Sequence, residues 1–368
     1  MSLVPDVIST KNGPAHPAPG DQGGKFEENS LVAGDSRASW QRELAAAVRS
    51  RAVLLRRLGL DGAPAALRDS AADPGDAGFP VLVPESFLRR MKSGDPCDPL
   101  LLQVLPTVAE SRSVAGFVTD AVGDQSARTA PGLLQKYAGR ALLIASGSCA
   151  VHCRYCFRRQ YPYHADPRGL GEWEPALRQI ADDTSLTEVI FSGGDPLMLT
   201  DLRLEVLVDR IDRIPHVERI RVHTRLPIVL PSRVTDGLLQ IFRTLRSQAV
   251  FVVHANHANE IDTECGDALR RLVQSGIPVL NQSVLLRGVN DSVEALEELS
   301  RRLIRLGVMP YYLHQLDRVA GTAHFEVAPE QGRMLVDQLT KRLPGYAVPR
   351  YVREIPGETS KIRLDAGS

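Results

Sequence analysis

The sequence predicts an α/β fold, a partial barrel of six β/α units with an N-terminal helical extension. The main observation is an alternation of short apolar runs with amphipathic helical patterns, which repeats roughly every 30 residues after a longer first unit. Such alternation is typical of right-handed βαβ units and a parallel sheet. Six units are too few for a closed eight-stranded barrel, so we expect an open one.

The individual elements follow from these two patterns. The apolar runs predicted as strands are 141–145, 188–191, 219–223, 250–254, 279–286 and 308–313. The predicted helices between and after them are 174–181, 202–214, 235–245, 264–275, 293–306 and 329–342. Ligands of such sheets gather at the carboxyl ends of the strands, so the residues that follow each run are the first candidates for a site.

The rest of the chain divides by composition. Residues 1–35, rich in Gly, Pro, Asn and Asp, are predicted to be a disordered tail, and 63–78 resembles them. Residues 36–130 form the predicted helical region, with helical patterns at 36–59, 85–93 and 99–108. Gly59 is the expected end of the first pattern. We assign 131–345 to the barrel and 346–368 to a C-terminal segment.

Charge and cysteine content narrow the class of protein. Lys plus Arg and Asp plus Glu both number 44, and this lack of a basic excess argues against a nucleic-acid partner. No signal peptide and no apolar stretch of bilayer length is visible, so we expect neither secretion nor a membrane. The five cysteines are an odd number, and three of them lie within eight residues. This favours metal chemistry in a reducing cytoplasm over a disulfide framework.

The clustered cysteines follow the first strand directly, as Cys149, Cys153 and Cys156 in a C-x3-C-x2-C spacing. Three thiolates can hold three irons of a 4Fe–4S cluster and leave one iron open for another ligand. This spacing resembles the radical S-adenosylmethionine (SAM) superfamily, in which SAM binds the open iron. Zinc or buried structural thiols are the alternatives, but His152 is badly spaced as a fourth zinc ligand. Cys97 and Cys265 show no partner pattern.

Further polar residues lie at or after the later strands. Two glycines in Ser192-Gly193-Gly194-Asp195 would allow close backbone approach, and the acid could accept from an ammonium group, as in the segment that holds the SAM amino group in radical SAM proteins. The same four residues also suit an ordinary tight turn. Other polar groups occur at 223–225, 254–260 and 281–291. Singly each suits a satisfied core residue, whereas together they favour a polar pocket.

From about Phe79 to the end, the sequence resembles the lysine 2,3-aminomutases, enzymes that combine radical SAM chemistry with pyridoxal phosphate. It is closest to the shorter bacterial type that makes β-lysine for modifying translation elongation factor P. The segments that carry the resemblance are 131–137, 147–163, 191–198, 223–231, 256–261, 281–291, 309–317 and 353–364.

The resemblance implies roles for individual residues around the cofactors. Lys361 would bind pyridoxal phosphate as a Schiff base, and Lys136, Tyr137 and Arg140 would surround its phosphate. On sequence alone, these residues would be taken for solvated surface. The residues implied at SAM and at the adjoining cofactor pocket are Ser192, Gly193, Gly194, Asp195, His254 and Gln282.

The resemblance also implies how a substrate lysine is held. Arg158 would grip the substrate carboxylate, and Asp317 and Glu354 would hold the ε-ammonium group. The catabolic enzymes carry Asp at the position of Glu354, so the geometry at that end differs here. They also continue into a cysteine-bearing tail that binds zinc. This chain ends seven residues after Lys361 without such cysteines, so we expect no zinc site, and association of identical chains through that tail is in doubt.

The function implied is an isomerase, an L-lysine 2,3-aminomutase that makes (R)-β-lysine in the cytoplasm. Its cofactors would be a 4Fe–4S cluster, SAM and pyridoxal phosphate. Its partners would be L-lysine, an external electron donor and, functionally, elongation factor P with its lysyl ligase. A catabolic aminomutase for lysine or another amino acid is the nearest alternative. More distant ones are a radical SAM enzyme without pyridoxal phosphate that acts on protein or RNA, and a metal-binding module without activity.

Overall fold

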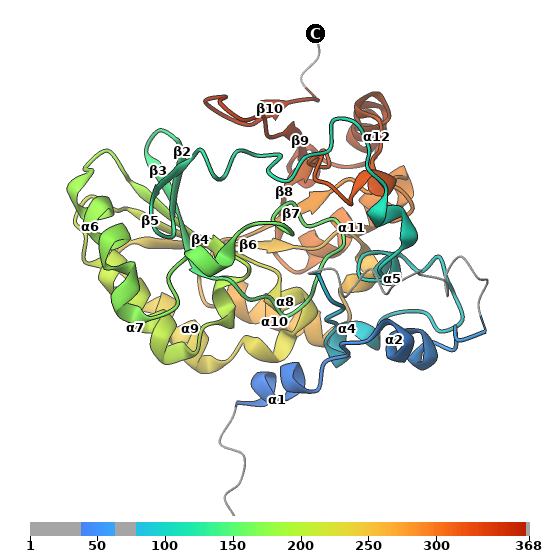
Figure 1. Ribbon diagram of the computed structural model, residues 1–368, viewed down its shortest axis with the longest axis horizontal. Helices are drawn as coiled ribbons and strands as arrows, with labels where there is room; N and C mark the ends of the chain where they lie inside the picture. Colours follow the sequence, from blue (N-terminus) through green and yellow to red (C-terminus); the bar gives the residue numbers. More distant parts are fainter. Residues whose placement is uncertain (1–37, 63–78, 366–368) are drawn as a thin grey trace, which may run out of the picture. The chain divides into compact units, whose positions relative to one another are not determined.

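The framework of the structure is a ten-stranded sheet in which the strands pair in chain order, from β1 to β10. The computed structural model describes residues 38–62 and 79–365, which belong to a unit spanning Ala38–Ser368 (Figure 1). The disordered segments predicted at 1–35 and 63–78 lie outside the described residues.

The central part of the sheet is parallel, from β3 to β9. Antiparallel strands flank it, with β1 and β2 on one side and β10 on the other. No pairing joins β10 to β1 in the described part of the chain, so the barrel is open, as predicted. The bounds are β1 (Arg128–Ala130), β2 (Leu133–Tyr137), β3 (Arg140–Ser146), β4 (Glu188–Gly193), β5 (Arg219–Thr224), β6 (Gln248–His254), β7 (Val279–Val284), β8 (Met309–His314), β9 (Arg350–Arg353) and β10 (Ile362–Arg363).

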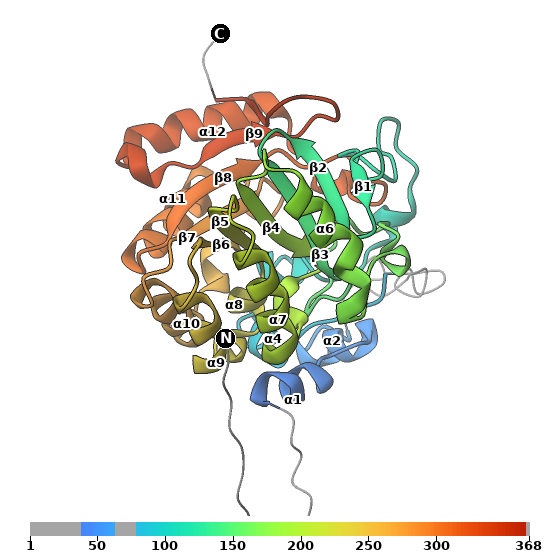
Figure 2. The same cartoon turned by 90° about the vertical axis from the view of Figure 1, so that its left-hand side faces the viewer.

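Helices follow the parallel strands and pack on the outer face of the curved sheet (Figure 2). The six predicted strands and the six predicted helices of the β/α units are all confirmed, with ends that shift by a few residues. No helix in residues 38–62 and 79–365 is both long and apolar enough to cross a membrane. The bounds are α6 (Glu174–Asp182), α7 (Asp201–Asp212), α8 (Leu226–Val229), α9 (Asp236–Arg243), α10 (Thr263–Gln274), α11 (Val293–Arg305) and α12 (Pro329–Arg342).

Successive side chains of a strand point to opposite faces of the sheet, so one face packs into the apolar core and the other faces the interior of the barrel. On β4, Val189 and Phe191 are fully buried in the main apolar core, whereas Ser192 belongs to the other face. Polar caps begin three of the outer helices: Thr235, Asp262 and Ser292 each accept a bond from a backbone N–H in the first turn of α9, α10 and α11. These caps fix the residue at which each of the three helices begins.

The N-terminal region differs from the prediction. The pattern at 36–59 forms two short helices, α1 (Ser39–Ala45) and α2 (Arg51–Arg57), because Val48 between them pairs with Val83 as an isolated β-bridge. The other two predicted helices are also short, as α4 (Glu85–Leu88) and α5 (Pro99–Leu102). Gly59, with φ of 67°, follows the end of α2 as expected.

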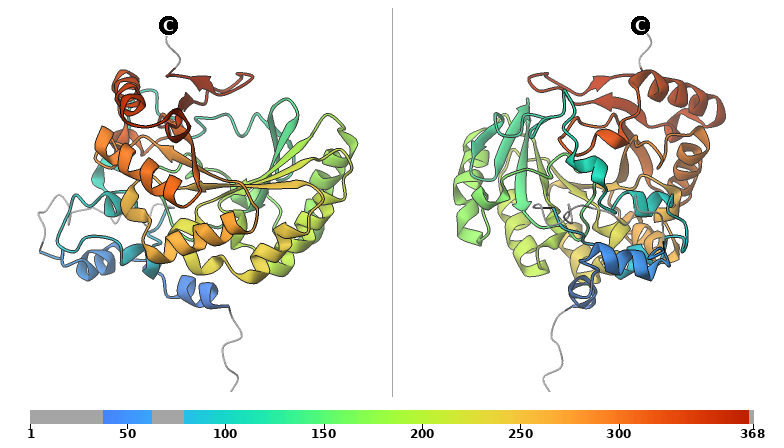
Figure 3. Two further views of the ribbon diagram at one scale, coloured as in Figure 1. Left: turned by 180° about the vertical axis from the view of Figure 1, so that it is seen from behind. Right: turned by 45° about the vertical axis from the view of Figure 1, so that its right-hand side comes forward.

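The two edges of the sheet approach each other through side chains. Lys136 on β2 forms an ion pair of 2.8 Å with Glu354, which follows β9. The segment between α5 and β1 crosses between these edges (Figures 1 and 3). Its Gly123 lies so close to the C-terminal segment that a Cβ atom there would be 3.2 Å from Pro356. The interior of the barrel is thus bounded by the hairpin β1–β2, this segment and the C-terminal residues.

Candidate functional site

The cysteine loop begins where β3 ends, and the end of β4 packs against it backbone to backbone. Gly194 N–H donates to Ser146 at 2.7 Å and Asp195 N–H donates to Ser148 at 2.8 Å. A Cβ on Gly193 or Gly194 would lie 2.3 and 2.5 Å from carbonyl oxygens of that loop. The two glycines are therefore required by this approach. It brings the predicted SAM-binding segment beside the free and partly exposed cysteines Cys149, Cys153 and Cys156.

The three thiols suit a cluster better than a single metal ion. Burial and the charges of the neighbouring thiols raise the pKa of Cys149, and they raise that of Cys156 to about 11. Within residues 38–62 and 79–365, no three His, Cys, Asp or Glu side chains lie close enough to hold one ion. Each cysteine of an iron–sulfur cluster binds a different iron, so its sulfurs can be further apart. The donor set thus fits a 4Fe–4S cluster, whose assembly would expel the thiol protons.

Buried ion pairs hold the loop between the cysteines. Arg154, which is fully buried, donates from Nε to Glu110 at 2.9 Å, and Arg159 donates to the same carboxylate at 2.7 Å. The ring of Phe79 lies against both guanidinium groups, at 4.9 and 5.0 Å. Segments before the barrel therefore help to fix the loop in place.

Asp195 was predicted to contact SAM, but its carboxylate already has partners in the chain. It accepts from Leu197 N–H at 3.0 Å, from the Thr224 hydroxyl at 2.8 Å and from Arg225 N–H at 2.7 Å. It is 3% exposed, and burial raises its pKa to about 6. These contacts tie the end of β4 to the end of β5.

A buried network supports Cys153. Arg225 donates from Nη1 to Cys153 Sγ at 2.6 Å, and from Nη2 to Gln103 at 2.7 Å and Glu260 at 2.9 Å. Glu260 is fully buried, and although burial opposes ionisation, the charge of Arg225 lowers its pKa. Arg225 and Glu260 were noted among the polar strand-end residues. Gln103 was missed, because its place in a predicted helix gave no signal.

His254 and Gln282 lie side by side, as the registered pair of β6 and β7. The Nε2 atom of His254 is 3.1 Å from the hydroxyl of Tyr155, which belongs to the cysteine loop. Burial and the charge of Arg225 lower the pKa of His254 to about 3, so its ring is neutral near pH 7. His254 therefore lies next to the cysteine loop, with Gln282 beside it on the neighbouring strand.

The second predicted centre surrounds Lys361, which directly precedes β10. Its Nζ atom forms an ion pair with Glu354, and the other oxygen of Glu354 accepts from Lys136 Nζ at 2.8 Å. Lys136 also forms an ion pair of 2.7 Å with Asp124. The predicted cofactor residues from β2 and from the C-terminal segment are therefore brought together around one carboxylate.

Buried polar atoms without partners surround this centre. Tyr137 Oη and His223 Nε2 are buried and make no hydrogen bond within the described part of the chain. Burial and the charge of Glu354 raise the pKa of Tyr137, and Arg140 stacks 5.2 Å from its ring. Burial and the positive charge of Lys361 also lower the pKa of two histidines. The pKa of His223 falls below its usual value, and that of His314 falls to about 3. Such orphaned groups fit a polar cofactor that has a phosphate and a ring hydroxyl.

Arg158 is nearly buried at 6% exposure, and it links the two centres. Its Nε atom donates to Asp124 at 2.6 Å, and its Nη1 atom donates to the hydroxyl of Ser192 at 3.1 Å. Asp124 thus joins Arg158 to Lys136. Sequence reasoning missed Asp124, since it lies in a segment of irregular structure without any motif.

Asp317 lies beyond β8 and is partly exposed. Burial and the negative charge of Glu354 raise its pKa to about 7, and the charges of Lys361 and Lys136 offset this only in part. The charges that act on the Asp317 carboxylate are thus those of the residues around Lys361.

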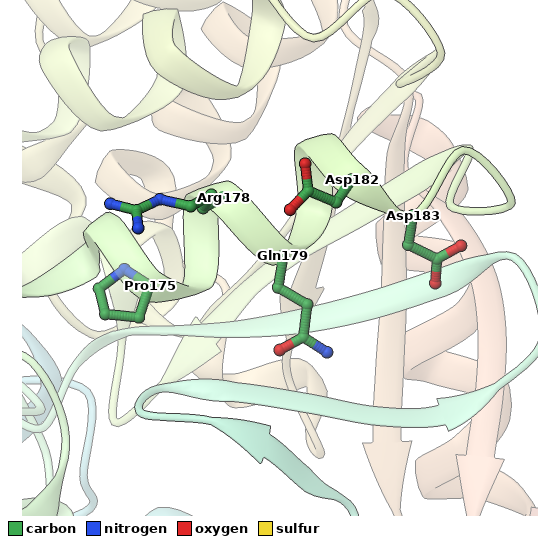
Figure 4. Close-up of a pocket in the computed structure, with 5 residues that line it drawn as sticks. All are labelled: Pro175, Arg178, Gln179, Asp182 and Asp183. Carbon is green, nitrogen blue, oxygen red and sulfur yellow. The ribbon is translucent and has the colours of Figure 1, made fainter.

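A surface hollow elsewhere contains none of the predicted residues. It lies on α6, on the outer side of the barrel, and its side chains point in different directions (Figure 4). Its lining residues are Pro175, Arg178, Gln179, Asp182 and Asp183. It is open and shallow and lacks convergent polar groups, so it is not the candidate site.

Comparison with known proteins identifies the family of this chain. Residues 143–300 match the model of the radical SAM superfamily. An L-lysine 2,3-aminomutase of Escherichia coli K12 is 46% identical over 90% of this chain and 95% of its own length. An L-lysine 2,3-aminomutase of Buchnera aphidicola is 41% identical over 92% of this chain and 98% of its own length. One of Clostridium subterminale is 35% identical over 75% of this chain and 66% of its own length. With its three cysteines beside the Gly-Gly segment and Lys361 in a charged group nearby, this chain belongs to the L-lysine 2,3-aminomutase family of radical SAM proteins.

Proposed function

We propose that this chain converts L-lysine to (R)-β-lysine by moving the amino group from C2 to C3. The observation that carries the proposal is the arrangement of charges around Lys361. Arg158 offers a cation for a carboxylate, and Asp317 and Glu354 offer anions for an ammonium group. An amino acid with a cationic side chain matches this polarity, whereas glutamate would place its second carboxylate against the acids.

The reaction needs a 4Fe–4S cluster with SAM to supply a radical and pyridoxal phosphate to accept the migrating nitrogen. Cys149, Cys153 and Cys156 would hold the cluster, and the Gly193–Gly194 backbone would face SAM. Lys361 would hold the cofactor, with Lys136, Tyr137 and Arg140 around its phosphate. Arg158 and the acids would fix the substrate at both ends, which keeps C2 and C3 in place and excludes water.

The direct test is anaerobic conversion of lysine by the reconstituted chain, with products separated by chromatography. We expect β-lysine to form only when SAM, pyridoxal phosphate and a reductant are present. Glutamate, arginine and alanine serve as competing substrates. A preference for glutamate over lysine would contradict the substrate assignment and leave the family assignment intact.

We further propose that the product serves the modification of elongation factor P in the cytoplasm, through a lysyl ligase and with an external electron donor. The support is the resemblance to the shorter bacterial type, and the alignment with the Escherichia coli relative covers 95% of that relative's length. Mass spectrometry of elongation factor P from a strain that lacks this gene tests it. Unchanged modification of the factor would favour the catabolic alternative.

A further inference from the structure

Arg225, directly after β5, is held in one orientation by the protein itself. Its backbone N–H donates to Asp195 at 2.7 Å, and its side chain is 8% exposed. The guanidinium group lies against the rings of Phe87 and Tyr155, 5.5 and 5.6 Å from their centroids. The backbone bond and the two rings together restrict the conformations that this side chain can adopt.

One arm of the guanidinium group is anchored by two side chains that are fully buried. The Nη2 atom of Arg225 donates to Gln103 at 2.7 Å and to Glu260 at 2.9 Å. The other oxygen of Glu260 accepts from Gln103 Nε2 at 3.1 Å and from the backbone N–H of Asn256 at 2.8 Å. Gln103 directly follows α5, so the region before the barrel helps to orient Arg225.

The other arm points at one of the three clustered cysteines. The Nη1 atom of Arg225 donates to Cys153 Sγ at 2.6 Å. Within 38–62 and 79–365, no lysine or arginine side chain makes a hydrogen bond to the sulfur of Cys149 or Cys156. The three thiols are therefore unequal, because Cys153 alone among them contacts a buried cation in this part of the chain.

A cation that donates to a cluster sulfur favours the reduced state, because the reduced cluster carries one more negative charge. Burial strengthens this effect, since little water is present to screen the charge. A hydrogen bond depends on distance and direction, so the groups that orient Arg225 contribute to the effect. The buried carboxylate of Glu260 has the opposite sign and limits it.

We propose that Arg225 raises the reduction potential of the cluster through its hydrogen bond to Cys153, and that Gln103 and Glu260 are positioning residues for this bond. The inference goes beyond the proposed function, because it concerns how readily the cluster accepts an electron from the donor. It rests on the proposed role of Cys153 as a cluster ligand.

SAM is the alternative partner of this arginine. The Nε atom of Arg225 is buried and makes no hydrogen bond within the described part of the chain. A carboxylate such as that of SAM would supply the missing acceptor. The two roles are separable, because the reduction potential of the cluster can be measured without SAM.

The test compares Arg225→Met, Arg225→Lys and Gln103→Leu in the full chain, reconstituted anaerobically. The reduction potential is measured without SAM by redox titration, with the reduced cluster followed by electron paramagnetic resonance. SAM affinity is measured separately by equilibrium dialysis, and iron content shows whether each variant holds the cluster.

Arg233→Met is the matched control for the loss of a buried arginine. Arg233 is also fully buried, and it lies 4.8 Å from the ring centroid of Trp40. It donates from Nε to the carbonyl oxygen of Leu197 at 2.7 Å and forms an ion pair of 2.8 Å with Asp201, away from the cysteines.

For Arg225→Met we expect the ratio of reduced to oxidised cluster at a fixed potential to fall by about 10-fold, which is a midpoint lower by about 59 mV. Arg225→Lys and Gln103→Leu should lower the ratio by only about 3-fold, since the first keeps the charge and the second keeps the donor without its anchor. Arg233→Met should lose stability and keep the potential of the parent.

An unchanged potential in Arg225→Met, with weakened SAM binding, would overturn the inference and assign Arg225 to SAM. An equal shift in Arg233→Met would overturn it as well, because the effect would then follow from the loss of any buried arginine. If Arg225→Met holds no iron, unchanged potentials in both Arg225→Lys and Gln103→Leu would overturn it. A parent chain without the signal of a reduced 4Fe–4S cluster would instead contradict the cluster of the proposed function.

Discussion

The buried carboxylate of Asp124 offers a quantitative test of how the site is held together. It is 1% exposed and lies between Arg158, at 2.6 Å, and Lys136, at 2.7 Å. Burial alone would raise the pKa of Asp124, but the two cations prevail and lower it from 3.8 to about 2. Since one pKa unit is worth about 1.4 kcal/mol, the ionised form contributes about 2 kcal/mol of stability.

Asp124→Asn keeps the shape and removes the charge. We expect the free energy of unfolding at pH 7 to fall by about 2 to 4 kcal/mol, because Arg158 is also left buried without its partner. A carboxyl group with a lowered folded pKa stabilises above its unfolded pKa near 3.8 and loses that contribution as pH falls toward about 2. The parent should therefore lose stability between pH 4 and 2 more steeply than the variant.

The assay is anaerobic urea unfolding followed by circular dichroism. Asp166→Asn is the matched control: Asp166 is 5% exposed and paired with Arg128 at 2.7 Å, but burial raises its pKa. Its ionisation therefore opposes folding, and the electrostatic loss at pH 7 should be smaller. The reasoning would be refuted if both variants lost the same free energy of unfolding at pH 7. It would also be refuted if Asp124→Asn lost stability between pH 4 and 2 as steeply as the parent.

Three further predictions concern the cofactors. Lys361→Ala should abolish the visible absorbance of bound pyridoxal phosphate and leave iron content unchanged, as spectroscopy and iron assay would show; an unchanged absorbance would mean that another lysine is the anchor. Gly194→Ala should lower iron retention after gel filtration, because its Cβ would lie 2.5 Å from the Ser148 carbonyl oxygen, whereas Gly171→Ala, with open space around it, should not. Replacement of any one of Cys149, Cys153 or Cys156 by Ala should abolish SAM cleavage. Replacement of Cys97 or Cys265 by Ala should leave SAM cleavage unchanged.

The parallel core of the fold could be predicted because periodicity there is strong. The runs at 141–145 and 188–191 are bounded by turn residues, and the helices between strands carry caps such as Thr235. The strand β9 could not be predicted in this way: Arg350–Arg353 has only two apolar residues, which lie between two arginines and show no periodicity, and pairing with β8 stabilises it. The break between α1 and α2 depends on the isolated bridge between Val48 and Val83, which local periodicity does not contain.

The site shows a similar limit. The cysteine spacing favours a cluster over zinc or structural thiols already at the level of sequence, because three thiolates without a well-placed fourth ligand suit an open 4Fe–4S cluster. Lys361 stood out only through resemblance, since a lysine near the chain end is normally solvated. Asp124 gave no signal at all, because its role comes from two cations that lie distant in sequence, on β2 and on the cysteine loop. The saturation of Asp195 is likewise visible only in three dimensions.

The migration of nitrogen between adjacent carbons is the central claim, and an isotope label follows it directly. L-Lysine labelled with 15N at the α-amino group would be incubated anaerobically with the reconstituted chain, SAM, pyridoxal phosphate and a reductant, and the product examined by NMR. The proposed function predicts a product whose 15N is bonded to C3, with no 15N released to solvent. Label that stays on C2, or that appears as free ammonia, would contradict it.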